Sequence, residues 1–114
     1  MSGIINREGD SCGAEISERY LASFRLALRI TSQDLDGEII DLIRAAREDL
    51  ALAGISFVLA AAETDPLIKR AIVTYVKAEF GLDNEDAEQY RVSYQRQKVA
   101  LAMSSAYTGL FKEE

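Results

Sequence analysis

The chain contains no histidine, and this absence excludes several kinds of chemistry. The single cysteine, Cys12, has no partner for an internal disulfide and no imidazole to act as its base. Ser-His-Asp catalysis and most zinc sites are excluded for the same reason. A site built from carboxylates is the remaining option for a metal, but there is no EF-hand loop and no Glu-x-x-His pair. We therefore predict that the protein is not an enzyme and binds no metal and no cofactor.

Long apolar runs are absent as well. The longest run, residues 55–62, is interrupted by Ser56 and is far shorter than the roughly 20 residues of a membrane-spanning helix. Residues 1–10 lack the cationic start and apolar stretch of a secretory signal. The sequence thus predicts a protein that is made in the cytoplasm and does not enter a membrane.

Positive charge is also scarce, with 13 basic residues against 19 acidic ones and a net charge of −6. Tight wrapping of DNA needs clustered Lys and Arg, so this balance argues against it, although a protein that stands beside DNA without gripping it is still compatible. The 114 residues suit one domain, and a hydrophobic content of 48% is ordinary for a globular chain.

The pattern of apolar residues predicts helices over most of the chain. Residues 1–14 contain three of the seven glycines and read as a flexible N-terminal arm, which leaves residues 15–114 as one helical domain. A first helix is expected at about residues 17–30, with Ser17 as its N-cap. A second should be capped by Ser32 or Asp34 and end before Gly54. Its apolar residues recur every three or four positions, namely Ile39, Ile43, Ala46, Leu50 and Ala53, whereas Arg44, Arg47, Glu48 and Asp49 should lie in water.

The third helix has the clearest boundaries. Asp65 is a capping acid, Pro66 suits the first turn, and Gly81 should end the helix after Phe80. Its apolar face is broad enough to place it at the centre of the bundle, with Leu67, Ile68, Ala71, Ile72, Tyr75 and Val76. Residues 55–62, just before it, are too short for periodicity to separate a strand from a helical turn.

The fourth helix is expected from about Asn84 to Tyr107 and is apolar on two nearly opposite sides. One side holds Ala87, Tyr90, Tyr94 and Leu101, and the other holds Val92, Val99, Met103, Ala106 and Leu110. One face can pack on the protein's own core, and the second is then open to another chain or covered by a neighbouring segment such as the N-terminal arm. The predicted fold class is all-α, a small bundle of four to five helices with a long C-terminal helix.

Several stretches resemble the head-tail connector (adaptor) family of tailed bacteriophages and prophages. They are DPLIKRAIVTYVKAEFG at residues 65–81, DAEQYR at residues 86–91, Ser93-Tyr94, Lys98, Leu101 and residues 104–107. The likeness covers about residues 35–107 and is strongest from Asp65 onward. Residues 1–14 extend beyond what the family pattern accounts for.

The resemblance implies a structural virion protein at the head-tail interface, where about twelve copies form a ring beneath the portal protein. Such a ring extends the DNA channel, lets DNA pass without sequence-specific binding, and offers a surface to a head-completion or tail protein. In this family the C-terminal helical part commonly engages the portal. Carried onto this chain, that role falls to the outer face of the fourth helix and the tail, with Val92, Val99, Met103, Ala106, Leu110 and Phe111 as the predicted partner-interface residues.

Two other classes stay open from the residues alone. A small acidic helical regulator or antitoxin-like binding protein would bind one partner in a fixed small stoichiometry and form no ring. A helix-turn-helix DNA-binding protein is disfavoured, because the acidic entry to the fourth helix, residues 83–86, would face the phosphates. Retention on DNA at low salt would be the test of that class.

Overall fold

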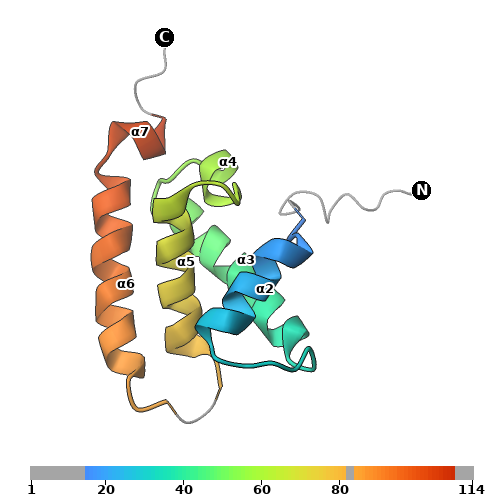
Figure 1. The fold of residues 1–114 in the computed structure, drawn as a ribbon. Helices are drawn as coiled ribbons and strands as arrows, with labels where there is room; N and C mark the ends of the chain where they lie inside the picture. The colour runs from blue at the N-terminus through green and yellow to red at the C-terminus, as the bar shows by residue number, and fades with distance from the viewer. Residues whose placement is uncertain (1–14, 82–83, 110–114) are drawn as a thin grey trace, which may run out of the picture.

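The computed structural model describes residues 15–81 and 84–109, and within these ranges the chain is helical with no strand (Figure 1). The helices are α2 (Glu18–Ala27), α3 (Asp36–Leu52), α4 (Phe57–Ala60), α5 (Pro66–Glu79), α6 (Ala87–Ala102) and α7 (Ser105–Thr108). Four of them are long, whereas α4 and α7 are single turns. The predicted all-α class is confirmed, and the predicted N-terminal arm lies outside the described residues.

Helix α2 begins at the predicted cap and ends earlier than expected. The Ser17 side chain accepts a hydrogen bond from the Tyr20 N–H at 3.1 Å, which satisfies one free donor of the first turn. The helix stops at Ala27 because Arg29 adopts a φ of 63°, in the left-handed region. The Ile30 N–H then reaches back to the carbonyl of Arg25 at 3.0 Å, the closing bond of a Schellman motif.

The predicted caps of α3 are wrong at one end and right at the other. Ser32 accepts a hydrogen bond from the Asp34 N–H instead of capping the helix, and the N-cap position falls on Leu35, whose side chain makes no capping bond. The local Ser32–Asp34 turn competes with the helix for the same groups. At the other end Gly54 has a φ of 104° and the Ile55 N–H bonds to the Leu50 carbonyl, as expected for a C′ glycine.

The buried face of α3 is the predicted one, with one addition. Ile39, Ile43, Ala46 and Leu50 are fully buried, as the spacing predicts, whereas Ala53, predicted for the same face, is half-buried at the C-cap. Arg47, predicted to lie in water, is only 1% exposed, and its guanidinium lies 5.9 Å from the centre of the Tyr20 ring. This prediction was wrong because α2 packs against α3 and brings the Tyr20 ring to Arg47, which the periodicity of α3 alone does not reveal. Burial also lowers the pKa of Arg47, and the aromatic face offsets part of its desolvation.

Helix α5 occupies the centre of the bundle and packs on both α3 and α6 (Figure 1). The Asp65 carboxylate accepts the N–H groups of Leu67 and Ile68 at 3.0 Å, and Gly81 follows the helix with a φ of 81°. The fully buried residues of α5 are Ile68, Ala71, Ile72 and Val76. Leu67, predicted to lie on the same apolar face, is 51% exposed instead. The ambiguous stretch before α5 contains the helical turn α4.

Helix α6 differs from the prediction at both ends. Asn84 accepts a hydrogen bond from the Asp86 N–H and donates to the Lys77 carbonyl, so it forms a turn before the helix and does not cap it. The predicted continuous helix also breaks after Ala102, because the Ser104 side chain accepts the Ala106 N–H and starts α7. This break changes which residues share a face near the C-terminus.

Candidate partner interface

Helix α6 buries only a narrow inner face. Tyr94 and Leu101 are its two fully buried residues, and both lie against the core. On the opposite side Val92 is 44% exposed, Val99 is 52% exposed and Met103 is 80% exposed. These three large apolar side chains define what we call the outer face of α6. Because exposed apolar side chains clustered on one helix face commonly mark a docking surface, this face is the first candidate for contact with another chain.

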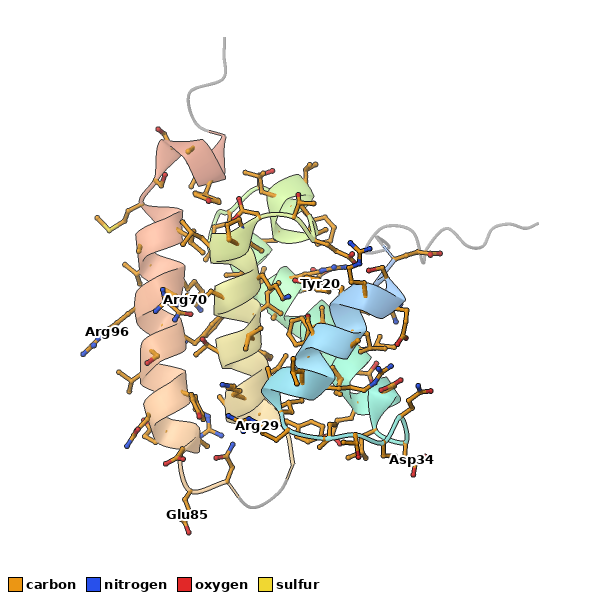
Figure 2. The ribbon with its side chains drawn as sticks, in the orientation of Figure 1. Tyr20, Arg29, Asp34, Arg70, Glu85 and Arg96 are labelled. Carbon is orange, nitrogen blue, oxygen red and sulfur yellow. The ribbon has the colours of Figure 1, made fainter. Side chains whose placement is uncertain are left out.

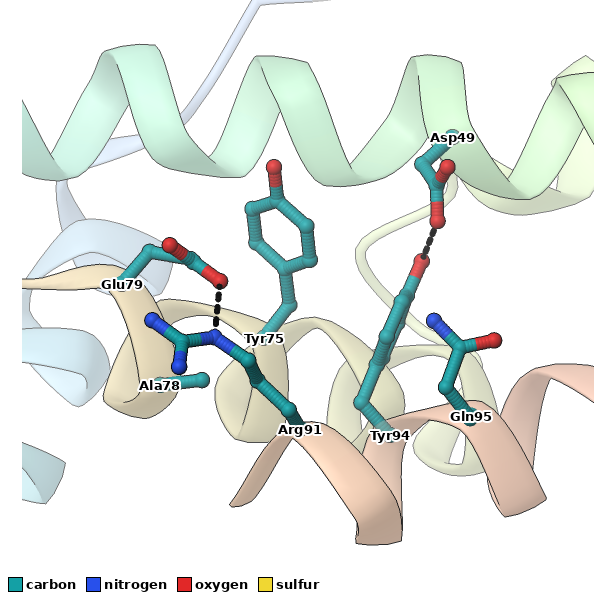
Figure 3. A pocket seen from close by; sticks show the side chains of 7 residues that line it. All are labelled: Asp49, Tyr75, Ala78, Glu79, Arg91, Tyr94 and Gln95. Carbon is teal, nitrogen blue, oxygen red and sulfur yellow. Dashed lines mark hydrogen bonds and ion pairs between the residues drawn. The ribbon is translucent and has the colours of Figure 1, made fainter. Parts of the chain in front are cut away.

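A polar link between α3 and α6 fixes the orientation of this outer face (Figure 3). The Tyr94 hydroxyl donates to the Asp49 carboxylate at 2.6 Å, and the Lys98 ammonium reaches the same carboxylate at 2.9 Å. The edge of the Tyr94 ring meets Tyr75 of α5, with the ring centres 5.1 Å apart. Burial and the Asp49 hydrogen bond raise the pKa of Tyr94, so its hydroxyl stays a donor. Asp49 was predicted to lie in water; it is instead half-buried, because α6 covers it.

A second ion pair holds the start of α6 to the end of α5. The Arg91 guanidinium lies 3.1 Å from the Glu79 carboxylate (Figure 3). The Glu88 carboxylate lies 3.6 Å from the same guanidinium. The hydrogen bond that Arg91 donates to Glu79 raises the pKa of Arg91. The recess between this pair and Tyr94 has a volume of about 180 Å³. Glu79 is paired with Arg91, and Asp49 is bonded to Tyr94 and Lys98, so these charged groups link the helices around the recess.

The single-turn helix α7 is fixed to the other end of the bundle through Tyr107. The Tyr107 hydroxyl donates to the Asp65 carboxylate at 3.0 Å, and the Tyr107 carbonyl accepts the Ser56 N–H at 2.7 Å. Asp65 therefore joins the start of α5 to α7 while it caps α5. Burial and this hydrogen bond raise the pKa of Tyr107. As a result α6 is held at both ends and its outer face is left open.

The structure brings together some of the predicted interface residues and not others. Val92, Val99 and Met103 lie on one face of α6 or at its C-cap, as predicted. Ala106 is exposed but belongs to α7, so it does not continue that face along one helix as predicted. Leu110 and Phe111 lie outside the described residues. The Ser104-Ser105 pair after Met103 was the available signal for the break, because serine favours N-cap positions.

One residue of this face, Arg96, was not assigned to it from the sequence. Arg96 lies between Val92 and Val99, and the positions 92, 96, 99 and 103 are spaced by four, three and four. This is the spacing of one helix stripe, so Arg96 belongs to the outer face. Figure 2 shows its side chain pointing away from the bundle.

Other kinds of site find no support in the part of the chain that the structure describes. In residues 15–81 and 84–109 there is no group of three or more Cys, Asp or Glu side chains placed to hold a metal ion. Within the same ranges, no helix has the length and apolarity that crossing a bilayer requires.

Comparison with known proteins identifies the family of the chain. A sequence model of a family described as phage connector protein matches residues 20–108. No curated protein and no solved structure matches the chain. The family is one of structural phage proteins, which implies a component of the virion that contacts other head or tail proteins. Because the match spans all six helices that the structure describes, apart from the first two residues of α2, the chain belongs to the phage connector protein family.

Proposed function

We propose that the protein is a head-tail connector subunit that assembles as a ring beneath the portal protein of a phage head. About twelve copies would form the ring, extend the DNA channel and offer a surface to a head-completion or tail protein. The observation that carries the proposal is membership of the connector family together with the open outer face of α6. A structural role also suits a chain in which the ion pairs Arg91–Glu79 and Lys98–Asp49 connect one helix to another.

The partner-interface residues in this proposal are Val92, Val99, Met103, Ala106, Leu110 and Phe111. In the role proposed for them, they contact neighbouring subunits or the portal. Ring closure joins two different patches of each subunit, and the outer face of α6 supplies one of them. Many such contacts act together in a ring, so each can be weak and the isolated protein can be a monomer.

The charge of the chain fits a channel that must release DNA. A net charge of −6 repels phosphates over about a Debye length, roughly 10 Å at 0.1 M salt. DNA then passes through the proposed ring without sequence-specific contacts. Synthesis in the host cytoplasm and incorporation at the head-tail interface complete the proposal.

The test is multi-angle light scattering on the purified protein over a range of concentrations, alone and with the portal protein of the same phage. A ring-sized species, alone or on the portal, is the expected result. A protein that stays monomeric or dimeric and ignores the portal at the highest concentration would overturn the proposal. In that case the protein would act as a binding module of another kind.

The outer face is tested by replacing Val99 and Met103 with alanine together. Loss of assembly or of portal binding is expected, because both side chains are exposed and contribute little to the folded monomer. Leu26→Ala is the matched control, since Leu26 is 75% exposed on α2, away from α6. Unchanged assembly and portal binding in the folded double variant would remove this face from the proposal.

A further inference from the structure

The outer face of α6 requires a partner that is both apolar and acidic. Arg96 is exposed in the middle of this face and forms no ion pair with any carboxylate in the described ranges. Val92 and Val99 lie on either side of it along the helix. A helix stripe with one charged position among apolar ones selects a partner helix with an opposite charge at the matching place.

The same chain carries such a surface on α3. Asp41, Arg44, Glu48 and Leu52 are exposed on the side of α3 that faces away from the core, and we call them the outer face of α3. Leu52 is 85% exposed, which is high for a leucine, and lies one turn beyond Glu48. Glu48 forms no ion pair with a described cation. On α3, Glu48 is followed by the exposed Leu52. This order of an acidic and an apolar side chain complements that on α6, where Arg96 is followed by Val99 and Met103.

The two outer faces point in different directions on one subunit. Asp49 contacts α6 through Tyr94 and Lys98, and Glu48, its neighbour in sequence, lies about 100° around α3 from it. On α6, Arg96 lies on the side opposite the buried Tyr94. One subunit therefore cannot pair these faces with each other. Two different faces that complement one another form a heterologous contact, the kind that closes a ring.

The directions of the helices also agree with this contact. Helices α3 and α6 run toward the same end of the bundle, where the Ser56 N–H after α3 bonds to the Tyr107 carbonyl after α6 (Figure 1). In a ring of about twelve copies, neighbours differ by a rotation of about 30°, which turns a helix by at most that angle. The two helices thus still run toward the same end of the ring across the contact. Moving toward their C-termini, Arg96 precedes Val99 and Met103 while Glu48 precedes Leu52.

We propose that the outer face of α6 in one copy packs against the outer face of α3 in the next copy, with Arg96 paired to Glu48. Val99 and Met103 then cover Leu52. A slip of one turn along α3 would set Arg96 against Arg44, so like-charge repulsion fixes the register. The inference rests on the proposed ring and names the partner of this face as a second copy of the chain.

The experiment reverses each charge separately and then combines the two variants. Arg96→Glu and Glu48→Arg are each made in the full chain, and circular dichroism checks that both remain folded. Sedimentation velocity measures assembly of each variant alone, and native mass spectrometry counts copies bound to the portal protein of the same phage. Each single variant is expected to need an at least about tenfold higher concentration to assemble, because each junction then opposes two like charges. An equimolar mixture should assemble as the unmodified protein does, because every junction in an alternating ring again joins an acid to a base.

Arg70→Glu and Asp34→Arg are the matched controls, since both residues are exposed and lie outside the two outer faces. They should assemble normally. If the charge-reversed variants assemble as well as the unmodified protein, or if their mixture fails to recover, the proposed contact is wrong while the ring can stand. If the unmodified protein neither assembles nor binds the portal, the proposed function itself fails.

Discussion

Replacing Tyr94 with phenylalanine tests how α6 is held in place. The substitution keeps the ring and its edge contact with Tyr75, and it removes only the hydroxyl that donates to Asp49 at 2.6 Å. Tyr94 is 3% exposed, so no water takes the place of the lost hydroxyl around residue 94. Asp49 keeps the Lys98 ammonium at 2.9 Å, and its side chain is 35% exposed. The carboxylate therefore regains part of its hydration.

These contacts set the expected size of the effect. Removing a hydrogen bond to a charged group costs about 1.5–3 kcal/mol of stability. Partial hydration of Asp49 places the loss at or just below the lower limit of this range, at about 1–1.5 kcal/mol in the free energy of unfolding. For a chain of this length 1 kcal/mol corresponds to about 4–8 °C, so Tm should fall by about 4–12 °C.

The assay is thermal and urea unfolding followed by circular dichroism at neutral pH. Tyr90→Phe is the matched control, because Tyr90 lies on the same helix, its ring stacks under Lys77 at 5.7 Å, and its hydroxyl has no described hydrogen-bond partner. The control should lose less than about 0.5 kcal/mol. A Tyr94→Phe loss no larger than that of the control would refute the reasoning that Asp49 anchors α6.

Three further outcomes are expected. Burial raises the pKa of Asp49, but the hydrogen bonds from Tyr94 and Lys98 outweigh this and hold it below its ordinary value of 3.8. The stabilisation by Asp49 is therefore complete above the ordinary pKa and is lost as the pH falls through the folded pKa. Lowering the pH from about 6 to about 3 should reduce the free energy of unfolding of the unmodified protein more than that of Asp49→Asn. Asp65→Ala removes an N-cap and the acceptor of Tyr107, and should cost about 1.5–2.5 kcal/mol in urea unfolding, against about 0.5–1 kcal/mol for Tyr107→Phe; equal losses would contradict the double role of Asp65. Arg29→Gly should raise the stability by about 0.5–1 kcal/mol because glycine adopts a φ of 63° without strain, whereas Arg29→Ala should give no such gain.

Local chemistry explains which boundaries could be predicted from the sequence. Ser17, Asp65 with Pro66, Gly54 and Gly81 all stand where predicted, because each acts on backbone groups within a few residues of itself. Such short-range signals do not depend on the rest of the fold. The central place of α5 followed from the width of its apolar face for the same reason.

The mistaken predictions concern contacts made between helices. Arg47 and Asp49 look like solvent-facing residues along α3, and only the crossing of α2 and α6 buries them. Their neighbours, Tyr20 and Tyr94, come from positions distant in sequence. The joint exposure of Val92, Val99 and Met103 was predicted, but the break before α7 moved Ala106 off the helix. Periodicity describes one helix at a time and carries no information on what crosses it.

The narrow attachment of α6 has a consequence for local opening of the protein. Of its 16 residues, only Tyr94 and Leu101 are buried, so its separation from the bundle removes fewer of its own side chains from the core than separation of α3 or α5 would. Amide hydrogens of α6 should therefore exchange with solvent through a partial opening that leaves α3 and α5 folded. Any chain that covers the outer face makes this opening harder, and slower exchange confined to α6 would record the docking directly.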